Sequence, residues 1–521
     1  MESRWLRAFL LLVAIPVLLG ITPKSSSAVE PDTIADVAAH NGGKGASLIA
    51  TQSIGNNGTG ISRAKILYSI DITKGTKNNT AGDIATIVNT VAGRMAEIQR
   101  ADDDGWTRDL DGSGGLLPNT YGLVGMGLLM AHKMNVKLVG STIQPASVVQ
   151  DEFLGAALKA GDALIEKAQT DPNTLVSTDV TFLYGLSRVY GGSNYMETCY
   201  HSAGYVGLHA FVEHHDPNDV CKIYDTVPAD ASTELKQLKL WQMASWVEAA
   251  KLYAGSGVDV DTTLSTWADS LMAKICNFQD SAGGFYYAQS SGKNLVRTAG
   301  QAKVVEVLKR FYAQNNTYKS KLKNGLAYLK GLQYGGTDST RRGSFYWGGE
   351  TVGTNLVTWN KVALEDQCYA VQAMAHNFQT RWNKLDNYKG THWGANYLIK
   401  SMMYGPQGGY EFFVDHKDFD PASTDVYVPR VDRNSEAIQA LYYSCKQGNI
   451  TRSGNNTAHN ALQVVNAIIG RRKPLGTQQM NGPEIVAADR NNDGKINDAD
   501  VSILIKDSIG DHEPIRSFLG L

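Results

Sequence analysis

Twelve residues near the C-terminus place oxygen-bearing side chains at the spacing of a calcium-binding loop. The stretch DRNNDGKINDAD occupies residues 489–500, and Gly494 at its sixth position permits the sharp turn that such a loop needs. Every ligand that this spacing provides is a hard oxygen atom, so the sequence predicts Ca²⁺ as a cofactor; an Asx-rich turn that binds nothing is the alternative. The six expected ligands are Asp489, Asn491, Asp493, the carbonyl of Lys495, Asn497 and Asp500.

This loop resembles a dockerin repeat, a variant of the EF-hand loop. Aspartate stands at its twelfth position in place of the usual glutamate, and the helix-like stretch VSILIKDSI follows. Dockerin repeats attach secreted polysaccharide enzymes to cohesin-bearing scaffolds, so the resemblance implies a cohesin-like scaffold as a partner. A complete dockerin has two repeats, and one is found here, which leaves a calcium-stabilised C-terminal tag as the alternative.

Acidic and aromatic residues gather in segments that could line a sugar-binding cleft. Aromatic rings stack on sugars, and cleavage of a glycosidic bond needs one carboxyl group to protonate the leaving oxygen and another to activate water or attack directly. The candidate catalytic acids, each close to a tryptophan in the sequence, are Asp104, Asp109 and Glu350. The candidate stacking residues are Trp106, Trp347, Trp359 and Tyr410. Solvated acids in ordinary turns are the alternative, because segments such as DLDGSGG are common in loops.

Two other chemistries remain open. In β-elimination from a uronic acid, a tyrosine or histidine would abstract the proton and an arginine would bind the carboxylate, for which Arg341, Arg342, Arg430 and Arg433 are available. A metal site is suggested by the residue types of a cluster that lacks an established ligand spacing. That cluster consists of Cys199, His201, His209, Glu213, His214, His215, Asp216 and Cys221.

The elements that must position these residues are two alternating kinds of helical segment. In residues 83–98 apolar side chains recur every three or four positions, which predicts an amphipathic helix with one buried face. Residues 121–130 are apolar on every side, which predicts a helix surrounded by other helices. The amphipathic kind recurs near residues 148–168, 202–214, 262–277, 319–331 and 393–403. The apolar kind recurs in TFLYGLSRVY, LWQMASWVEAAKLY, QAKVVEVLKRFY, DQCYAVQAMA and EAIQALYYS.

A repeat of about 60 residues relates the apolar segments and indicates a supersecondary unit. We therefore predict an all-α fold in which residues 82–470 form an α/α toroid of about six helical hairpins; an open α-solenoid is the alternative. In such a ring the loops that lead from outer to inner helices meet at one end, which we call the mouth. The acidic and aromatic segments fall in these loops.

Two short segments resemble families with this fold. NKV at residues 360–362 with DQCY at 366–369 resembles the zinc-binding D-x-C-Y segment of protein prenyltransferase β subunits, and QDSAGGF at 279–285 resembles a terpenoid-cyclase repeat. The resemblance implies an α/α toroid, an architecture shared with (α/α)6-barrel carbohydrate-active enzymes. No histidine stands in a matching downstream position, so a zinc site lacks its third ligand. We interpret Asp366 as a helix N-terminal residue and Cys368 as a core residue.

The flanking segments indicate export. Residues 1–28 contain two arginines, an apolar run too short to span a bilayer and a small-residue cleavage site, which predicts a signal peptide and a secreted protein without a membrane span after cleavage. Residues 29–81 are expected to be a partly ordered lead-in, 471–483 a linker and 484–521 the calcium-binding repeat. Export permits disulfides, and a clip between Cys199 and Cys221 remains open.

Composition narrows the function. The 49 basic residues nearly balance the 51 acidic ones, which excludes the strong basic field of a nucleic-acid-binding protein. We therefore expect a secreted carbohydrate-active enzyme, a polysaccharide hydrolase or lyase that takes polysaccharide or oligosaccharide as its partner. A non-catalytic glycan-binding or cell-surface structural protein on the same scaffold is the alternative.

Overall fold

The computed structural model describes most of the chain between residues 81 and 509. The described residues are 81–110, 112, 115, 120–139, 142–145, 148–189, 195–214, 233–255, 261–338, 341–377, 389–399, 403–404, 412–413, 416–418, 429–445, 465, 482–491 and 494–509. The predicted signal peptide, nearly all of the lead-in and most of the linker lie outside them.

Six inner helices form a closed ring within the described part of the chain. Each packs against the next, and the last returns to the first, so the ring closes between α17 and α6. The all-α toroid is therefore confirmed and an open solenoid is excluded, because the end helices of a solenoid do not meet. The inner helices are α6 (Tyr121–Met134), α8 (Ser177–Leu186), α10 (Thr233–Ala254), α12 (Thr298–Tyr312), α14 (Leu364–His376) and α17 (Val431–Cys445).

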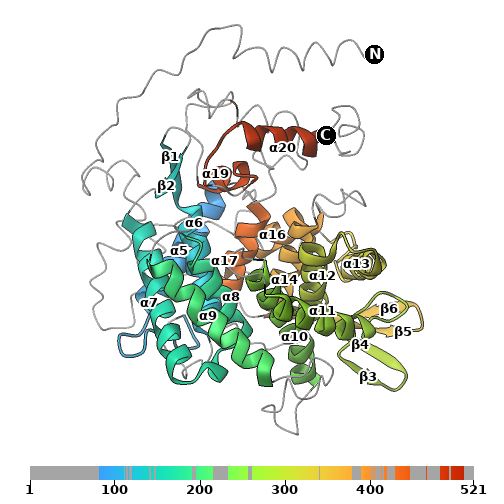
Figure 1. The fold of residues 1–521 in the computed structure, drawn as a ribbon. Helices are drawn as coiled ribbons and strands as arrows, with labels where there is room; N and C mark the ends of the chain where they lie inside the picture. The colour runs from blue at the N-terminus through green and yellow to red at the C-terminus, as the bar shows by residue number, and fades with distance from the viewer. Residues whose placement is uncertain are drawn as a thin grey trace, which may run out of the picture.

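An outer helical segment precedes each inner helix in the chain (Figure 1). From α7 onward, each outer segment packs mainly against the inner helix that comes before it. In the first of them the five apolar residues Ile84, Ile87, Val88, Val91 and Met95 are fully buried, as the amphipathic pattern predicts. The outer segments are α5 (Ala81–Glu97), α7 (Val148–Thr170), α9 (Tyr195–His214), α11 (Thr262–Asn277), α13 (Asn316–Gly331), and the π-helical turn η4 (Lys389–Trp393) with α16 (Gly394–Tyr397). A short 3-10 turn, η2 (Pro172–Thr174), joins α7 to α8.

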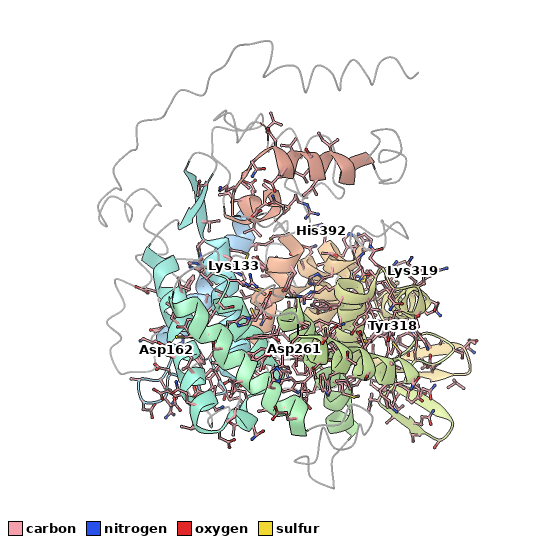
Figure 2. The ribbon with its side chains drawn as sticks, in the orientation of Figure 1. Lys133, Asp162, Asp261, Tyr318, Lys319 and His392 are labelled. Atoms are coloured by element: carbon pink, nitrogen blue, oxygen red, sulfur yellow. The ribbon has the colours of Figure 1, made fainter. Side chains whose placement is uncertain are left out.

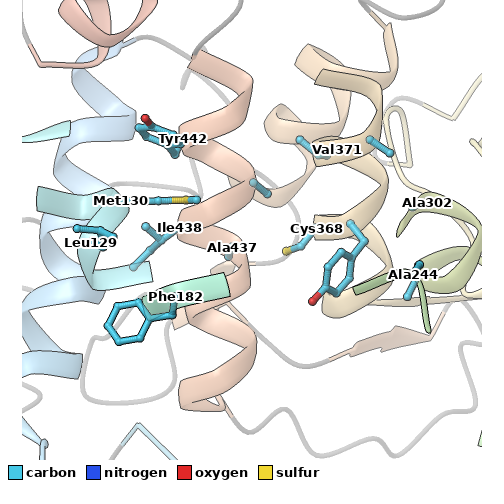
Figure 3. Packing of buried hydrophobic residues seen from close by; sticks show 14 of the residues in the cluster. Leu129, Met130, Phe182, Ala244, Ala302, Cys368, Val371, Ala437, Ile438 and Tyr442 are labelled. Carbon is cyan, nitrogen blue, oxygen red and sulfur yellow. The ribbon is translucent and has the colours of Figure 1, made fainter. Parts of the chain in front are cut away.

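Glycines let the inner helices approach closely. A Cβ atom on Gly125 of α6 would lie 2.4 Å from the ring of Phe182 in α8, and one on Gly127 would lie 2.2 Å from Oγ of Ser435 in α17. Only glycine fits at such contacts, which explains the glycines in the predicted inner segment. Figure 3 shows the result, with Leu129 and Met130 of α6 beside Ile438 of α17.

Two buried glutamines, Gln301 on α12 and Gln367 on α14, hold two mouth loops to the ring through the same pattern of hydrogen bonds. The side-chain oxygen of Gln301 accepts the backbone N–H of Phe285 at 2.7 Å, and that of Gln367 accepts the N–H of Phe345 at 2.7 Å. The Gln301 amide donates to the carbonyl of Gly283, and the Gln367 amide to that of Gly343. The terpenoid-cyclase-like segment at 279–285 is thus one copy of a repeated loop anchor.

Short strands join the mouth loops to one another. The sheet β3 (Ala288–Ser290), β4 (Lys293–Arg297), β5 (Gly348–Val352) and β6 (Asn355–Thr358) links the loops before α12 and α14. In addition, β7 (Lys361–Ala363) pairs with β10 (His416–Asp418), and Asp109 pairs with Arg430. Two further short strands are β8 (Met403–Tyr404) and β9 (Phe412–Phe413). Strands of two to five residues carry too little alternation to be recognised in the sequence.

The C-terminal element packs on the opposite end of the toroid. Its helix α19 (Gly482–Ala488) contacts α5, α6 and α17 and the hairpin of β1 (Val136–Val139) and β2 (Thr142–Pro145), and the calcium-type loop leads into α20 (Asp498–Ile509) (Figure 1). Val486 belongs to the main core, and Lys495 forms a β-bridge with Thr142. The element is thus joined to the toroid by side chains and backbone, whereas the sequence indicated a separate module. No helix among the described residues is both long and apolar enough to cross a membrane.

Candidate functional site

Trp106 lies in the core and offers no ring face to a sugar. It is 1% exposed, and its indole Nε1 donates to the carbonyl oxygen of Met95 at 2.8 Å. Asp104 lies in the same loop with a positive φ of 53°, and its backbone carbonyl accepts from the side chain of Gln99. This loop is held by core packing and by its own hydrogen bonds.

The other two candidate acids are engaged by cations. Asp109 is buried, and both of its carboxylate oxygens accept from Arg108, at 3.0 and 3.1 Å. Glu350 lies on β5, where its carboxylate is 2.6 Å from Nζ of Lys293. No hydrogen bond or ion pair in the described part of the chain joins these two acids to each other.

The half-buried Trp347 and Trp359 lie together in the loop before α14. Their ring centroids are 5.3 Å apart and the rings are tilted by 49°. The guanidinium of Arg297 lies 4.8 Å from the Trp347 ring, and Nζ of Lys361 lies 5.5 Å from it. The tryptophan pair therefore borders a cationic part of the mouth. Tyr410, the fourth candidate stacking residue, lies outside the described residues.

A chain of alternating charges is buried where α12, α14 and α17 begin. Nη2 of Arg297 lies 3.0 Å from Asp366 and 3.5 Å from Glu365. Nη2 of Arg433 lies 2.9 Å from Glu365, and its Nη1 lies 3.1 Å from Glu436. Two guanidinium groups thus hold Asp366, Glu365 and Glu436 in one network, which we call the mouth carboxylate cluster. Asp432 adjoins it, 3.7 Å from Nε of Arg433.

Burial dominates the protonation behaviour of two members of this cluster. Asp366 is fully buried, and loss of hydration raises its pKa to about 6 even though Arg297 favours the charged form. Burial likewise raises the pKa of Glu436 well above its ordinary value, and the neighbouring Glu365 adds to the shift. The cluster therefore holds carboxyl groups that keep a proton at a pH where exposed acids have lost theirs.

The shared nitrogen of Arg297 sets an upper limit on the separation of two acids in the cluster. The oxygens of Asp366 and Glu365 lie 3.0 and 3.5 Å from the same Arg297 nitrogen, so they are at most 6.5 Å apart. Retaining glycosidases place their two carboxyl groups about 5 to 5.5 Å apart, which falls within this limit, whereas the range of about 6.5 to 9.5 Å in inverting enzymes lies beyond it. Asp366 can keep a proton, and the neighbouring Glu365 faces two guanidinium groups that favour its charged form. Glycosidic cleavage needs one protonated and one charged carboxyl group.

The sequence interpretation of Asp366 was incomplete. The residue does lie in the first turn of α14, but its Oδ1 accepts the backbone N–H of Ala299 at the start of α12. Glu436 stood unnoticed in the apolar segment EAIQALYYS. A usable signal was the presence of charged residues inside segments predicted to be buried on every side. The prediction for Cys368 is confirmed, because it is fully buried in the core.

The described members of the cysteine and histidine cluster serve other purposes. Nε2 of His209 lies 2.9 Å from Asp261, which also accepts from Tyr205 and caps α11 (Figure 2 labels Asp261). Cys199 is a free thiol, so the disulfide considered for it is not formed. Among the residues that the structure describes, no three His, Cys, Asp or Glu side chains converge as metal ligands. His215, Asp216 and Cys221 lie outside those residues.

The calcium-type loop is closed by its last residue. Asp500 is buried, and its carboxylate accepts the backbone N–H groups of Arg490, Asn491 and Asn497 at 2.7, 3.3 and 2.9 Å. Gly494 has a φ of +75°, as the turn at position six requires. At the ligand positions of this loop that the structure describes, the residues offer oxygen atoms. Oxygen is the ligand type that Ca²⁺ prefers. Asp493 lies outside the described residues.

No protein-family profile and no curated protein matches the sequence. Among solved structures, the chain is similar to an unsaturated glucuronyl hydrolase variant from Streptococcus agalactiae, with 10% identity and a TM-score of 0.48 over 75% of this chain and 96% of that one. It is also similar to cellobiose 2-epimerase from Bacillus thermoamylovorans, with 12% identity and a TM-score of 0.43 over 69% and 99%. A D-mannose isomerase has 12% identity and a TM-score of 0.45 over 69% and 97%. The toroid is assigned from the helix contacts of this chain.

Proposed function

We propose that the protein is a carbohydrate-processing enzyme that hydrolyses glycosidic bonds at the mouth carboxylate cluster. The observation that supports this most strongly is the Asp366–Arg297–Glu365 arrangement, in which two buried carboxyl groups share one guanidinium nitrogen. General acid catalysis on a sugar needs a carboxyl group with a raised pKa, and Asp366 is such a group.

The environments of the two acids suggest different roles. Asp366 keeps its proton to about pH 6 and would donate it to the leaving glycosidic oxygen. Glu365 faces Arg297 and Arg433, which can balance a negative charge, and would activate water or attack the sugar directly. Trp347, which lies against Arg297, would contribute an aromatic border for the sugar.

Proton abstraction by tyrosine is less well supported. Tyr369 is the tyrosine whose electrostatic partners include Glu365, Glu436 and Arg433, and burial raises its pKa well above the ordinary value. A base that must lose its proton near neutral pH needs the opposite shift. The lyase reaction is therefore the second candidate, and an unsaturated uronide product would identify it.

Amide substitutions test the hydrolytic proposal. Asp366→Asn and Glu365→Gln keep the shape of the side chains and remove the acid–base function, so each should lower turnover of a cleaved glycan by about 10²–10⁴-fold. Glu350→Gln and Asp109→Asn are matched controls and should retain activity. Parental turnover in both Asp366→Asn and Glu365→Gln would exclude this site. A protein that binds glycans on an array and cleaves none would instead be the non-catalytic alternative.

We also propose that residues 489–500 bind Ca²⁺. The closed loop and the oxygen chemistry of Asp489, Asn491, Asn497 and Asp500 support this. Titration of Ca²⁺ into the intact protein should give a saturable heat and raise the melting temperature. Asp489→Ala should abolish both effects, whereas Asp498→Ala, which changes an exposed acid outside the ligand set, should preserve them. Equal binding by both variants would contradict the assignment.

We infer that the protein is secreted after removal of residues 1–28. The N-terminal arginines, the short apolar run and the small-residue site support this inference. N-terminal sequencing of the exported protein should begin near Val29. A cohesin-like scaffold remains a proposed partner, and retention of the intact protein on immobilised cohesin in Ca²⁺ but not in chelator would support it. Equal elution with and without Ca²⁺ would contradict it.

A further inference from the structure

The small core of the C-terminal element is completed by a residue of the toroid. From Gly482 to Ile509 the element has fewer than the roughly 40 residues below which a chain usually needs a metal, disulfides or a partner to fold. Val136 of β1 packs against its core. The buried residues of that core are Ile485, Ala487, Ala488, Ile496 and Leu504. The β1–β2 hairpin therefore supplies apolar contact that the element cannot provide for itself.

The same hairpin restrains one side of the calcium-type loop. Lys495, whose backbone carbonyl is the expected ligand at position seven, forms an antiparallel β-bridge with Thr142 of β2. The next residue, Ile496, is 1% exposed within the small core. Backbone hydrogen bonds and burial thus fix the chain at positions seven and eight of the loop, and the hairpin contributes to both.

Helix α19 restrains the other side of the loop. Asp489, the expected first ligand, follows α19 directly, and its backbone N–H donates to the carbonyl of Ile485 at 3.0 Å. This helix packs against α5, α6 and α17. Burial raises the pKa of Tyr442 on α17, and the charges of Lys133 on α6 and of Asp489 act on the same group (Figure 2 labels Lys133). The first ligand therefore lies close to the two helices whose contact closes the ring.

That contact between α6 and α17, which we call the seam, lacks the support of a short connection. In the described part of the chain, every other contact between adjacent inner helices joins two that follow one another in the sequence. At the seam, Oγ of Ser435 donates to the carbonyl of Leu123, and the two residues are 312 positions apart. Closing a longer loop costs more entropy, so we expect the ring to open first at the seam.

We propose that Ca²⁺ bound at residues 489–500 fastens the seam, with the β1–β2 hairpin and the helices under α19 as the toroid's half of the calcium-binding unit. This inference rests on the proposed calcium binding. It adds that, without the ion, the acidic loop rearranges, the element loosens from the hairpin and the seam opens more often. The coupling is reciprocal, so contacts made by the toroid must also strengthen the binding of the ion.

A hairpin variant tests the toroid's contribution to calcium binding. Val136→Ala removes part of the contact with the small core and keeps the backbone bridge of Thr142. It should weaken Ca²⁺ binding to the intact protein about fivefold in calorimetric titration, the scale of two lost methyl groups. Val357→Ala is the matched control, because Val357 is 50% exposed on β6, and should bind Ca²⁺ as the parent does. Parental affinity in Val136→Ala would overturn the role of the hairpin.

Hydrogen exchange of the intact protein, measured by mass spectrometry in Ca²⁺ and in EGTA, tests the effect on the seam. Ca²⁺ should slow exchange in peptides of α6 and α17 about tenfold and leave those of α10 and α12, across the ring, unchanged. In Ca²⁺, Asp489→Ala should exchange like the parent in EGTA, and Asp498→Ala like the parent in Ca²⁺. Saturable binding of Ca²⁺ with equal exchange at the seam would overturn this inference and leave calcium binding established. No heat of binding would remove both.

Discussion

Asp366 accepts a hydrogen bond from Arg297 at 3.0 Å, yet its pKa is raised to about 6. An adjacent guanidinium normally favours the carboxylate, so burial outweighs the ion pair here. The folded-state pKa lies above the ordinary value of 3.8, so the folded protein binds this proton more tightly than the unfolded chain does. Stability should therefore decrease as pH rises from about 4 to about 6, on the order of 3 kcal/mol from this group.

Denaturation measured between pH 4 and 8 checks this expectation. Asp366→Asn carries no titrating proton, so its stability should decrease less steeply over the same window. Glu436 contributes in the same direction and would retain part of the slope. Glu350→Gln should keep the parental slope. Identical curves for the parent and Asp366→Asn would mean that Asp366 does not titrate in this range.

Glu248 should show the opposite dependence on pH. Burial alone would raise its pKa, but the charges of Lys303 and Arg310 prevail and lower it to about 2. The stabilisation is present above the ordinary value of 4.5 and is lost as pH decreases towards 2. Glu248→Gln should cost about 3 to 5 kcal/mol at pH 7, because it leaves buried cations with too little countercharge. Denaturant unfolding at pH 7 measures this loss, and exposed Glu213→Gln should change little.

Trp106 should matter for stability and not for sugar binding. Replacement by alanine removes a core side chain and its hydrogen bond to Met95, at a cost of about 3 to 5 kcal/mol. Trp347→Ala, which changes a half-buried residue at the mouth, should cost less stability and weaken glycan binding. Thermal unfolding and calorimetric glycan titration of both variants separate these effects. Reduced affinity in a folded Trp106→Ala protein would contradict the core assignment.

Removal of residues 482–521 should destabilise the toroid itself. Val486 packs in the main core and α19 covers α5, α6 and α17, so truncation exposes apolar surface on the ring. We expect a loss of about 2 kcal/mol, or roughly 5 °C in melting temperature. Ca²⁺ should raise the melting temperature of the full chain and leave that of the truncated chain unchanged. An unchanged melting temperature after truncation would show that the element is an independent appendage.

The sequence by itself determined the helices and their pairing into hairpins. The three-to-four spacing of Ile84, Ile87 and Val91 marks a helix with one buried face, and the uniformly apolar residues 121–130 mark a helix buried all round. These patterns are local, because helix geometry depends on neighbouring residues along the chain. The repeat of the two patterns predicted the toroid, which the contact between α17 and α6 confirms.

Only the tertiary structure decided which acids meet. Asp366 and Glu365 lie in the first turn of α14 and Glu436 in the second turn of α17, and they come together through Arg297 and Arg433. Proximity of loop acids to tryptophan in the sequence indicated Asp104, Asp109 and Glu350 instead. A carboxyl group's chemistry depends on burial and on charges that arrive from distant segments, and neither is encoded in the residues beside it. For that reason the fold could be predicted from periodicity, while the candidate site required the closed ring.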